Sequence, residues 1–467
     1  MTHSWRAFAK DMYTFIWEIE MSLSYFTRLL MGIAALGLLN AGSARSDEPS
    51  RLPVVGRTLT DALRNEEAQS DFFSVSTHVT DASVVSNFGG SKGCDCDGKG
   101  CYDCDQQLEL PGNTCVLSFF GDFRLRHESQ FKTGPLTSHN RHRQRLRFRF
   151  GANFEFSDQL MVGFRARTGN PDDPNSPHRT FDGAFNSVDF NLDRAFVQYD
   201  PYWLPGLSVI GGKASTQFVT NPVYSELVWD DDINPEGLAL VYEPGDMLRF
   251  VTGAYIVEER HANPGVNEDT NLLTAQLTGR RELSNGAELV GSLGFYYYTE
   301  LSPDATLLAE NAPMGNGNLG NLTDGGVTRY LSDFEIWNAI VAYNTTVGCT
   351  PVVLSGEYMK NEGAVNDDDD GYAIGFKAGQ TKESGDRQLF YQYQDIEQEA
   401  IFAGFSNDDF PYQTNFRGHV IGVNQKLGKA TIVRIWALNS ERILAPAAPV
   451  FADSSRWTLR ADWNIKF

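Results

Sequence analysis

Alternation of polar and apolar residues is the dominant pattern of this chain. In residues 141–150, RHRQRLRFRF, arginine occupies every odd position and largely apolar residues occupy the even positions. Successive side chains of a β-strand point to opposite faces, so the segment predicts a strand with guanidinium groups on one face and an apolar row on the other. A closed barrel in lipid, apolar outside and lined by water inside, accommodates both rows.

The same alternation recurs before and after this segment and at the end of the chain. Arg124 and Arg126 alternate with apolar residues in FRLRHE, and Arg165 and Arg167 do so in GFRART. The last eleven residues, WTLRADWNIKF, form one amphipathic strand that ends on Phe467. A terminal strand of this kind resembles the assembly signal of bacterial outer-membrane barrels, so we expect Phe467 to serve as that signal.

From about residue 117 the chain divides into about sixteen strand candidates. Turn-like breaks such as Ser284-Asn285-Gly286 alternate with long breaks such as 215–235, as expected for short periplasmic turns and long external loops. The predicted fold class is therefore all-β, a transmembrane antiparallel up-and-down β-barrel of about 16 strands within a range of 14–18. The candidates are residues 117–130, 142–157, 159–169, 188–201, 205–214, 236–244, 246–261, 269–283, 286–301, 331–346, 349–362, 369–382, 386–398, 416–427, 429–441 and 455–467.

Two segments precede the barrel, which we place at residues 116–467. Residues 1–46 are typical of a secretory signal peptide, because the apolar run LLMGIAALGLL is followed by small residues and a cleavage point near Ala44 to Ser46. Met21 is an alternative start, and a membrane anchor is the other interpretation of the apolar run. Residues 47–115 are expected to form a short periplasmic leader that contains cysteines.

Composition narrows the possible functions. Aromatic residues make up 12% of the chain, which suits aromatic girdles, and the mean hydropathy of -0.33 suits a barrel with a polar interior. The formal net charge of -21 argues against nucleic-acid binding. Because the strand candidates above are locally rich in arginine, we expect the acidic excess to lie in loops and in the N-terminal region.

Several motifs, in order along the chain, resemble one family. They are RQRLRFRFGANFEF, FRARTGNPDDPNS, NLDRAFVQYDP, the GGK of residues 211–213 and LVWDDDINPEGLALVY. Together they resemble the putative-porin family, which is similar in style to phosphate-selective porins and alginate-export barrels. The resemblance covers residues 118–260 closely and the rest by architecture. It implies a water-filled barrel in the outer membrane of a Gram-negative-type envelope, which passes small solutes and needs no cofactor.

Arginine on the inner face would give such a pore its chemistry. Low-dielectric walls focus the field of a charged lumen, and rings of Arg or Lys line anion pores. We therefore predict a porin for small hydrophilic, preferentially anionic solutes. The alternative is a structural network in which acidic residues such as Glu155 and Asp462 neutralise the arginines. The predicted pore lining is Arg124, Arg126, Arg143, Arg145, Arg147, Arg149, Arg165 and Arg167, with Arg194 and Arg460 as further candidates.

The third long loop, residues 215–235, is the candidate constriction. In many general porins the third external loop folds into the barrel and sets acidic residues opposite a basic wall. Here the loop carries Glu226, Asp230, Asp231 and Asp232. A solvated external loop is the alternative interpretation.

The six cysteines offer two interpretations. Export to an oxidising compartment favours disulfides, whereas thiolates at short spacings also suit zinc. The spacing fits no standard zinc template, so we predict no metal site. Cys115 and Cys349 are both expected at the periplasmic rim, which makes a bridge between them one hypothesis. The disulfide candidates are Cys94, Cys96, Cys101, Cys104, Cys115 and Cys349.

Two other classes of function compete with transport. An envelope structural or adhesion protein would use the barrel as a membrane anchor, and a barrel enzyme such as an outer-membrane lipase would need an outward-facing Ser-His pair. The eight histidines offer no such pair on a recognisable strand, so we predict no enzyme activity. The expected partners are outer-membrane lipid, the barrel assembly machinery, small anionic solutes and further copies of the chain in a homotrimer, with no nucleic acid.

Overall fold

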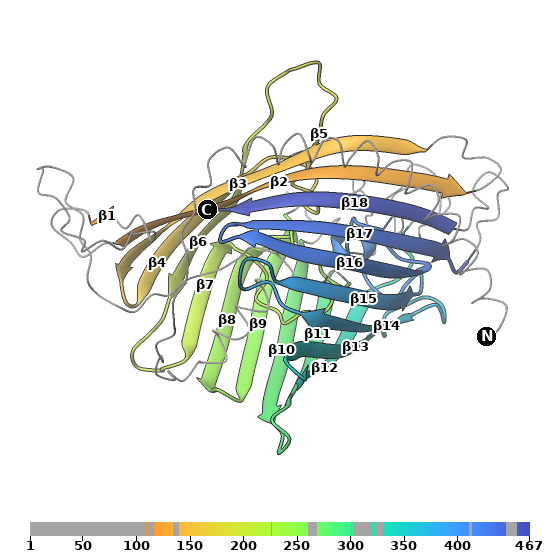
Figure 1. The fold of residues 1–467 in the computed structure, drawn as a ribbon. Coiled ribbons are helices and arrows are strands. Elements are labelled where there is room, and N and C mark those ends of the chain that lie inside the picture. The colour runs from red at the N-terminus through yellow and green to blue at the C-terminus, as the bar shows by residue number, and fades with distance from the viewer. Residues whose placement is uncertain are drawn as a thin grey trace, which may run out of the picture. The chain divides into compact units, whose positions relative to one another are not determined.

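Sixteen long antiparallel strands form one closed ring (Figure 1). The sheet has 18 strands, but β1 (Leu108–Glu109) and β5 (Arg179–Thr180) are two-residue strands that pair with β2 and β3 outside the ring order. Pairing of β18 (Ser455–Lys466) with β2 (Val116–Thr133) closes the barrel. The computed structural model describes residues 108–109, 116–133, 140–225, 227–259, 269–299, 301, 320–322, 330–410, 413–444 and 455–467.

The other strands of the ring follow one another in chain order around it. They are β3 (Arg141–Ser157), β4 (Leu160–Arg167), β6 (Asn191–Tyr199), β7 (Leu207–Lys213), β8 (Glu236–Gly245), β9 (Leu248–Glu258), β10 (Thr270–Glu282), β11 (Glu288–Thr299), β12 (Phe334–Val347), β13 (Thr350–Asn361), β14 (Asp370–Gly379), β15 (Arg387–Ile396), β16 (Phe416–Gly428) and β17 (Thr431–Arg442).

The predicted fold class is confirmed, and each strand candidate corresponds to one strand of the ring. Strand bounds differ from the prediction by up to three residues, and one difference with a clear cause is at β4, which ends at Arg167 rather than at residue 169. Gly169 has a positive φ of 108°, and a Cβ at this position would lie 2.7 Å from the Ser176 carbonyl oxygen. The chain therefore turns sharply at this glycine, and the strand cannot continue through it.

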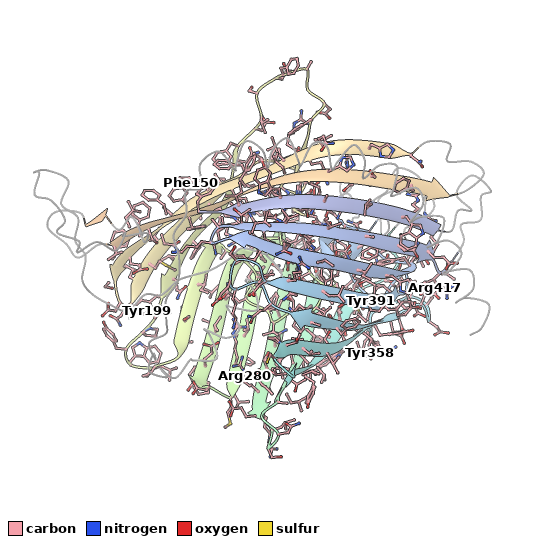
Figure 2. The ribbon with its side chains drawn as sticks, in the orientation of Figure 1. Phe150, Tyr199, Arg280, Tyr358, Tyr391 and Arg417 are labelled. Atoms are coloured by element: carbon pink, nitrogen blue, oxygen red, sulfur yellow. The ribbon has the colours of Figure 1, made fainter. Side chains whose placement is uncertain are left out.

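The outward faces of the strands are apolar. Large apolar side chains are exposed along several strands, for example Leu277, Val341 and Ile374. Exposed aromatic side chains lie near the ends of strands, among them Tyr199 and Tyr358 (Figure 2). In the part of the chain that the structure describes, no helix is long and apolar enough to cross a membrane.

Loops that fold into the barrel cover part of its inner face. An apolar core forms where loop residues such as Trp229 and Phe405 pack on luminal side chains of β11 such as Tyr296. The rings of Trp229 and Phe405 stack at 5.9 Å, and the rings of Trp229 and Tyr296 meet edge to face at 5.4 Å. A short 3-10 helix, η3 (Ala403–Phe405), carries Phe405. This core lies inside the ring of strands.

Several predictions fall outside the described residues. These are the signal peptide of residues 1–46, nearly all of the 47–115 leader, the five cysteines from Cys94 to Cys115, and Glu226. Cys349 lies exposed in the turn between β12 and β13 and forms no disulfide with a described residue. The bridge between Cys115 and Cys349 stays a prediction.

Phe467 takes part in the closure of the barrel. Its backbone N–H donates to the Gly121 carbonyl at 3.1 Å, and the Gly121 N–H donates to the Phe467 carbonyl at 2.8 Å. Its ring stacks on Phe148 of β3 at 6.1 Å. A Cβ at position 121 would lie 2.6 Å from the Phe467 ring, so glycine there lets the ring pack against the backbone of β2.

Phe467→Asp should impair assembly, because a carboxylate replaces the ring on the apolar outer face of the closing strands. We expect most of the variant to lose heat-modifiable migration on gels and to accumulate unfolded in the periplasm. Phe467→Tyr keeps the aromatic contact and is the matched control. Normal membrane insertion of the Asp variant would show that the ring is dispensable for assembly.

Candidate functional site

Arginines of neighbouring strands face each other across the luminal surface of the barrel. Arg124 of β2 lies opposite Arg147 of β3, and Arg126 lies opposite Arg145. Like charges directly opposite one another on a sheet are destabilising, so an array of this kind needs counter-charges. We call the luminal faces of β2, β3, β4, β6 and β18 the charged wall.

Carboxylates on the same strands supply counter-charge. Asp122 accepts from Arg147 at 3.0 Å and from Arg149 at 2.6 Å, and Glu128 lies 2.6 Å from Arg143 and 2.7 Å from Arg460. Such charge-assisted contacts between a guanidinium and a carboxylate are among the stronger hydrogen bonds in proteins. The charged wall is therefore a network of alternating charges rather than a bare column of arginine.

Two further carboxylates complete the network on either side. Asp193 of β6 lies 2.5 Å from Arg165 and 3.3 Å from Arg167, and Asp462 of β18 lies 2.8 Å from Arg126. Asp462 was one of the two expected partners. The other, Glu155, makes no ion pair with any residue that the structure describes.

The loop between β7 and β8, residues 214–235, lies inside the barrel. On one side Val219 exchanges hydrogen bonds with the Gln276 side chain of β10, and Asn221 accepts from Ser355 of β13 at 2.8 Å. Leu227 and Trp229 are almost fully buried. The described part of this loop is therefore packed against the strands from within, and it is not a solvated external loop.

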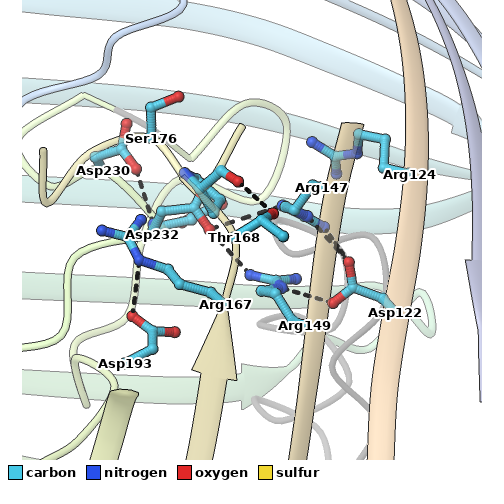
Figure 3. Close-up of polar contacts among 12 residues, drawn as sticks. Asp122, Arg124, Arg147, Arg149, Arg167, Thr168, Ser176, Asp193, Asp230 and Asp232 are labelled. Atoms are coloured by element: carbon cyan, nitrogen blue, oxygen red, sulfur yellow. Dashed lines mark hydrogen bonds and ion pairs between the residues drawn. The ribbon is translucent and has the colours of Figure 1, made fainter. Parts of the chain in front are cut away.

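On the other side the same loop reaches the charged wall. Asp232 accepts from Arg149 at 2.9 Å and lies 3.7 Å from Arg147, as Figure 3 shows. Arg194 donates to Asn234 at 2.6 Å. The loop thus connects two sides of the lumen, and its predicted acidic residue Asp232 contacts the predicted pore-lining arginines. Asp231 instead accepts from Ser225 within the loop.

A second loop in the lumen was not anticipated from the sequence. Residues 397–415, between β15 and β16, bring Asp409 against Arg460 and to 3.7 Å from Arg126. Tyr224 of the β7–β8 loop also donates to Asp409, at 2.8 Å. The sequence signal for this loop was the combination of paired aspartates with Phe402, Phe405 and Phe410. Three phenylalanine side chains in a solvated loop would expose a large apolar surface to water.

Residues 168–178, between β4 and β5, form a third luminal segment. Ser176 accepts from Arg145 at 3.1 Å, and the Asn175 amide donates to the Ser406 carbonyl at 2.8 Å. This segment therefore contacts both the β15–β16 loop and the charged wall. Residues 170–187 are the break between the strand candidates 159–169 and 188–201, and nothing in their polar composition distinguishes the part that enters the lumen.

Comparison of the sequence with models of known protein families identifies the family of this chain. The model of a family described as putative porin matches residues 133–313 and 332–461, about two thirds of the chain. The chain belongs to the putative-porin family. It is an outer-membrane β-barrel of the kind that forms channels, with its apolar outer face in contact with lipid. No curated protein matches the sequence.

Solved porin structures are similar to this porin in fold alone. One is OprB of Pseudomonas putida in its high-pH form, at 12% identity and a TM-score of 0.51, covering 75% of this chain and 94% of that chain. Another is a triple mutant of the Rhodopseudomonas blastica porin, at 12% identity and a TM-score of 0.44, covering 75% of this chain and all of that one.

Two aspartates join the β7–β8 and β15–β16 loops of this porin. The Asp408 N–H donates to the Asp230 carboxylate at 3.3 Å, and the Asp230 N–H donates to the Phe405 carbonyl at 2.8 Å. Burial and the repulsion of neighbouring aspartates raise the pKa of Asp230 well above its ordinary value and that of Asp408 to about 6, although Arg145 and Arg460 oppose the shift at Asp408. Protonation therefore relieves the cost of burying these carboxylates and their mutual repulsion where the two loops meet.

We expect the protonation of Asp230 and Asp408 to make the stability of the protein depend on pH. A carboxyl group with a raised folded-state pKa stabilises the fold fully below its ordinary pKa of 3.8, and that contribution is lost as the pH rises through about 6. Wild-type protein in detergent should therefore become less resistant to heat between pH 4 and pH 7, and Asp408→Asn should remove part of that loss. Resistance to heat is measured as the midpoint temperature at which the migration of the protein on gels changes from the folded to the unfolded position. The exposed Asp367→Asn is the control, and identical pH curves for Asp408→Asn and wild type would contradict the assignment.

Proposed function

We propose that this porin lets small hydrophilic solutes diffuse across the outer membrane and prefers anions. The observation that supports the preference is the charged wall, where neighbouring strands direct more arginines than carboxylates toward the interior. A charged lumen enclosed by low-dielectric walls raises the local concentration of counter-ions and their rate of entry. Guanidinium groups stay charged at any relevant pH, so the preference should hold across the physiological range.

The β7–β8 loop is the proposed constriction. Because Asp232 contacts Arg149 and Asp230 lies beside it, acidic and basic groups face each other across a short distance. A transverse field of this kind would orient dipolar solutes and would weaken with salt. The ion pairs of the charged wall lower its net charge, so we expect a moderate preference rather than strict exclusion of cations.

The proposal also covers the cellular location and the assembly of the barrel. The apolar outer face and the family support insertion into the outer membrane of a Gram-negative-type envelope by the barrel assembly machinery. A homotrimer is the proposed assembly, and no cofactor is required for diffusion. The family and the fold are those of channel proteins rather than enzymes.

Changing Arg143, Arg145 and Arg147 together to Ser should shift ion preference toward cations. Field focusing changes entry rates by about tenfold or more, so the ratio of anion to cation permeability should fall by roughly that factor. Reversal potentials across a planar bilayer in a salt gradient measure the ratio.

A matched control changes Arg280, Arg281 and Arg387 to Ser, which removes the same charge at strand ends away from the charged wall. It should have a much smaller effect. An unchanged reversal potential in the charged-wall variant, or an equal shift in both variants, would reject the proposed lining.

A further inference from the structure

Arg124 differs from the other arginines predicted to line the pore. The other seven each lie within 4.0 Å of a carboxylate oxygen of a described residue. Arg124 is only 8% exposed, and its one hydrogen bond to a described side chain runs from Nε to the neutral Asn464 side chain at 2.6 Å. Figure 3 shows its guanidinium beside Arg147, with no dashed line to any residue drawn.

Arg145 makes the longest ion pair of the other seven. Its Nη1 lies 4.0 Å from Glu128, its Nη2 donates to Ser176 at 3.1 Å, and its buried Nε has no hydrogen-bond partner among the residues that the structure describes. Arg145 precedes Arg147 by two residues, so Arg124 and Arg145 are diagonal neighbours across the β2–β3 pair. Diagonal positions lie about 7–8 Å apart, within reach of long side chains.

The segment between β4 and β5 adds neutral groups beside these two arginines. Its Ser176 hydroxyl already contacts Arg145, and the buried Nε2 of His178 has no hydrogen-bond partner in the described part of the chain. Burial, followed by the charges of the neighbouring arginines, lowers the pKa of His178 well below its ordinary value. The imidazole is therefore neutral and lies in the field of the arginine array, where it can donate or accept one hydrogen bond.

We propose that Arg124, Arg145, Ser176 and His178 form a binding site for a divalent tetrahedral oxyanion, with inorganic phosphate as the simplest example. The inference rests on the proposed function and specifies its substrate class. Neither guanidinium donates a hydrogen bond to a carboxylate of a described residue, so their two positive charges match two negative charges, and their planar forks suit phosphate oxygens. The donors come from three different elements, β2, β3 and the β4–β5 segment, and four tetrahedral oxygens match such a set better than the two coplanar oxygens of a carboxylate.

Equilibrium dialysis of radiolabelled inorganic phosphate against the folded full-length protein in detergent tests the site without requiring conduction. Wild-type protein should bind phosphate saturably, and Arg124→Gln should weaken binding at least about tenfold, the equivalent of one charged hydrogen bond. Arg280→Gln is the matched control, because it removes an arginine that is paired with Glu288 on the opposite side of the barrel. Sulfate should compete with phosphate, and acetate should not.

Several outcomes would overturn the site. They are the absence of saturable phosphate binding by wild type, equal weakening by Arg124→Gln and Arg280→Gln, and competition by acetate as effective as that by sulfate. Heat-modifiable migration verifies the fold of each variant, and Arg124→Lys, which keeps the charge but not the fork, should bind with intermediate affinity. If the protein binds phosphate but shows no anion preference in reversal potentials, the site stands and the proposed anion preference is rejected. If it prefers anions but does not bind phosphate, the site is rejected and the proposed anion preference stands.

Discussion

Repulsion among the luminal arginines is the constraint on which the interior of this barrel depends. The pairing of β2 with β3 places Arg124 opposite Arg147 and Arg126 opposite Arg145, and such an array is stable only with carboxylates nearby. Strand residues provide part of them, and the loops provide the rest through Asp232 and Asp409. The same ion pairs that relieve the repulsion therefore hold two loops inside the lumen.

Each of these loops is amphipathic in a way that matches the lumen. Trp229 precedes the aspartates of the β7–β8 loop, and Phe405 precedes those of the β15–β16 loop. The aromatic residues pack with Tyr296 in the apolar core, while the acidic residues turn to the charged wall or to each other. The interior is thus divided into an apolar part that packs like a protein core and a polar part that water and solutes would occupy.

The sequence predicted the strands well because their signal is local. A two-residue period in RHRQRLRFRF identifies both faces of β3, and turn residues mark the strand ends. The contacts of the β15–β16 loop are different, because Arg126 and Asp409 are far apart in the chain and no period connects them. Arg124 lacks a close carboxylate among the described residues because the neighbouring arginines form ion pairs with the nearby carboxylates. This is a property of the folded network, and the alternation of residues along a strand does not reveal it.

The contact between Arg149 and Asp232 tests the central claim most directly, because it joins the β7–β8 loop to the charged wall at 2.9 Å. A double-mutant cycle with Arg149→Met and Asp232→Asn, followed by thermal unfolding of the folded barrel in detergent, isolates their coupling. The account predicts that each single variant is destabilised and that the double variant is less destabilised than the sum of the two. Strict additivity would show that the loop is not held against the charged wall by this ion pair.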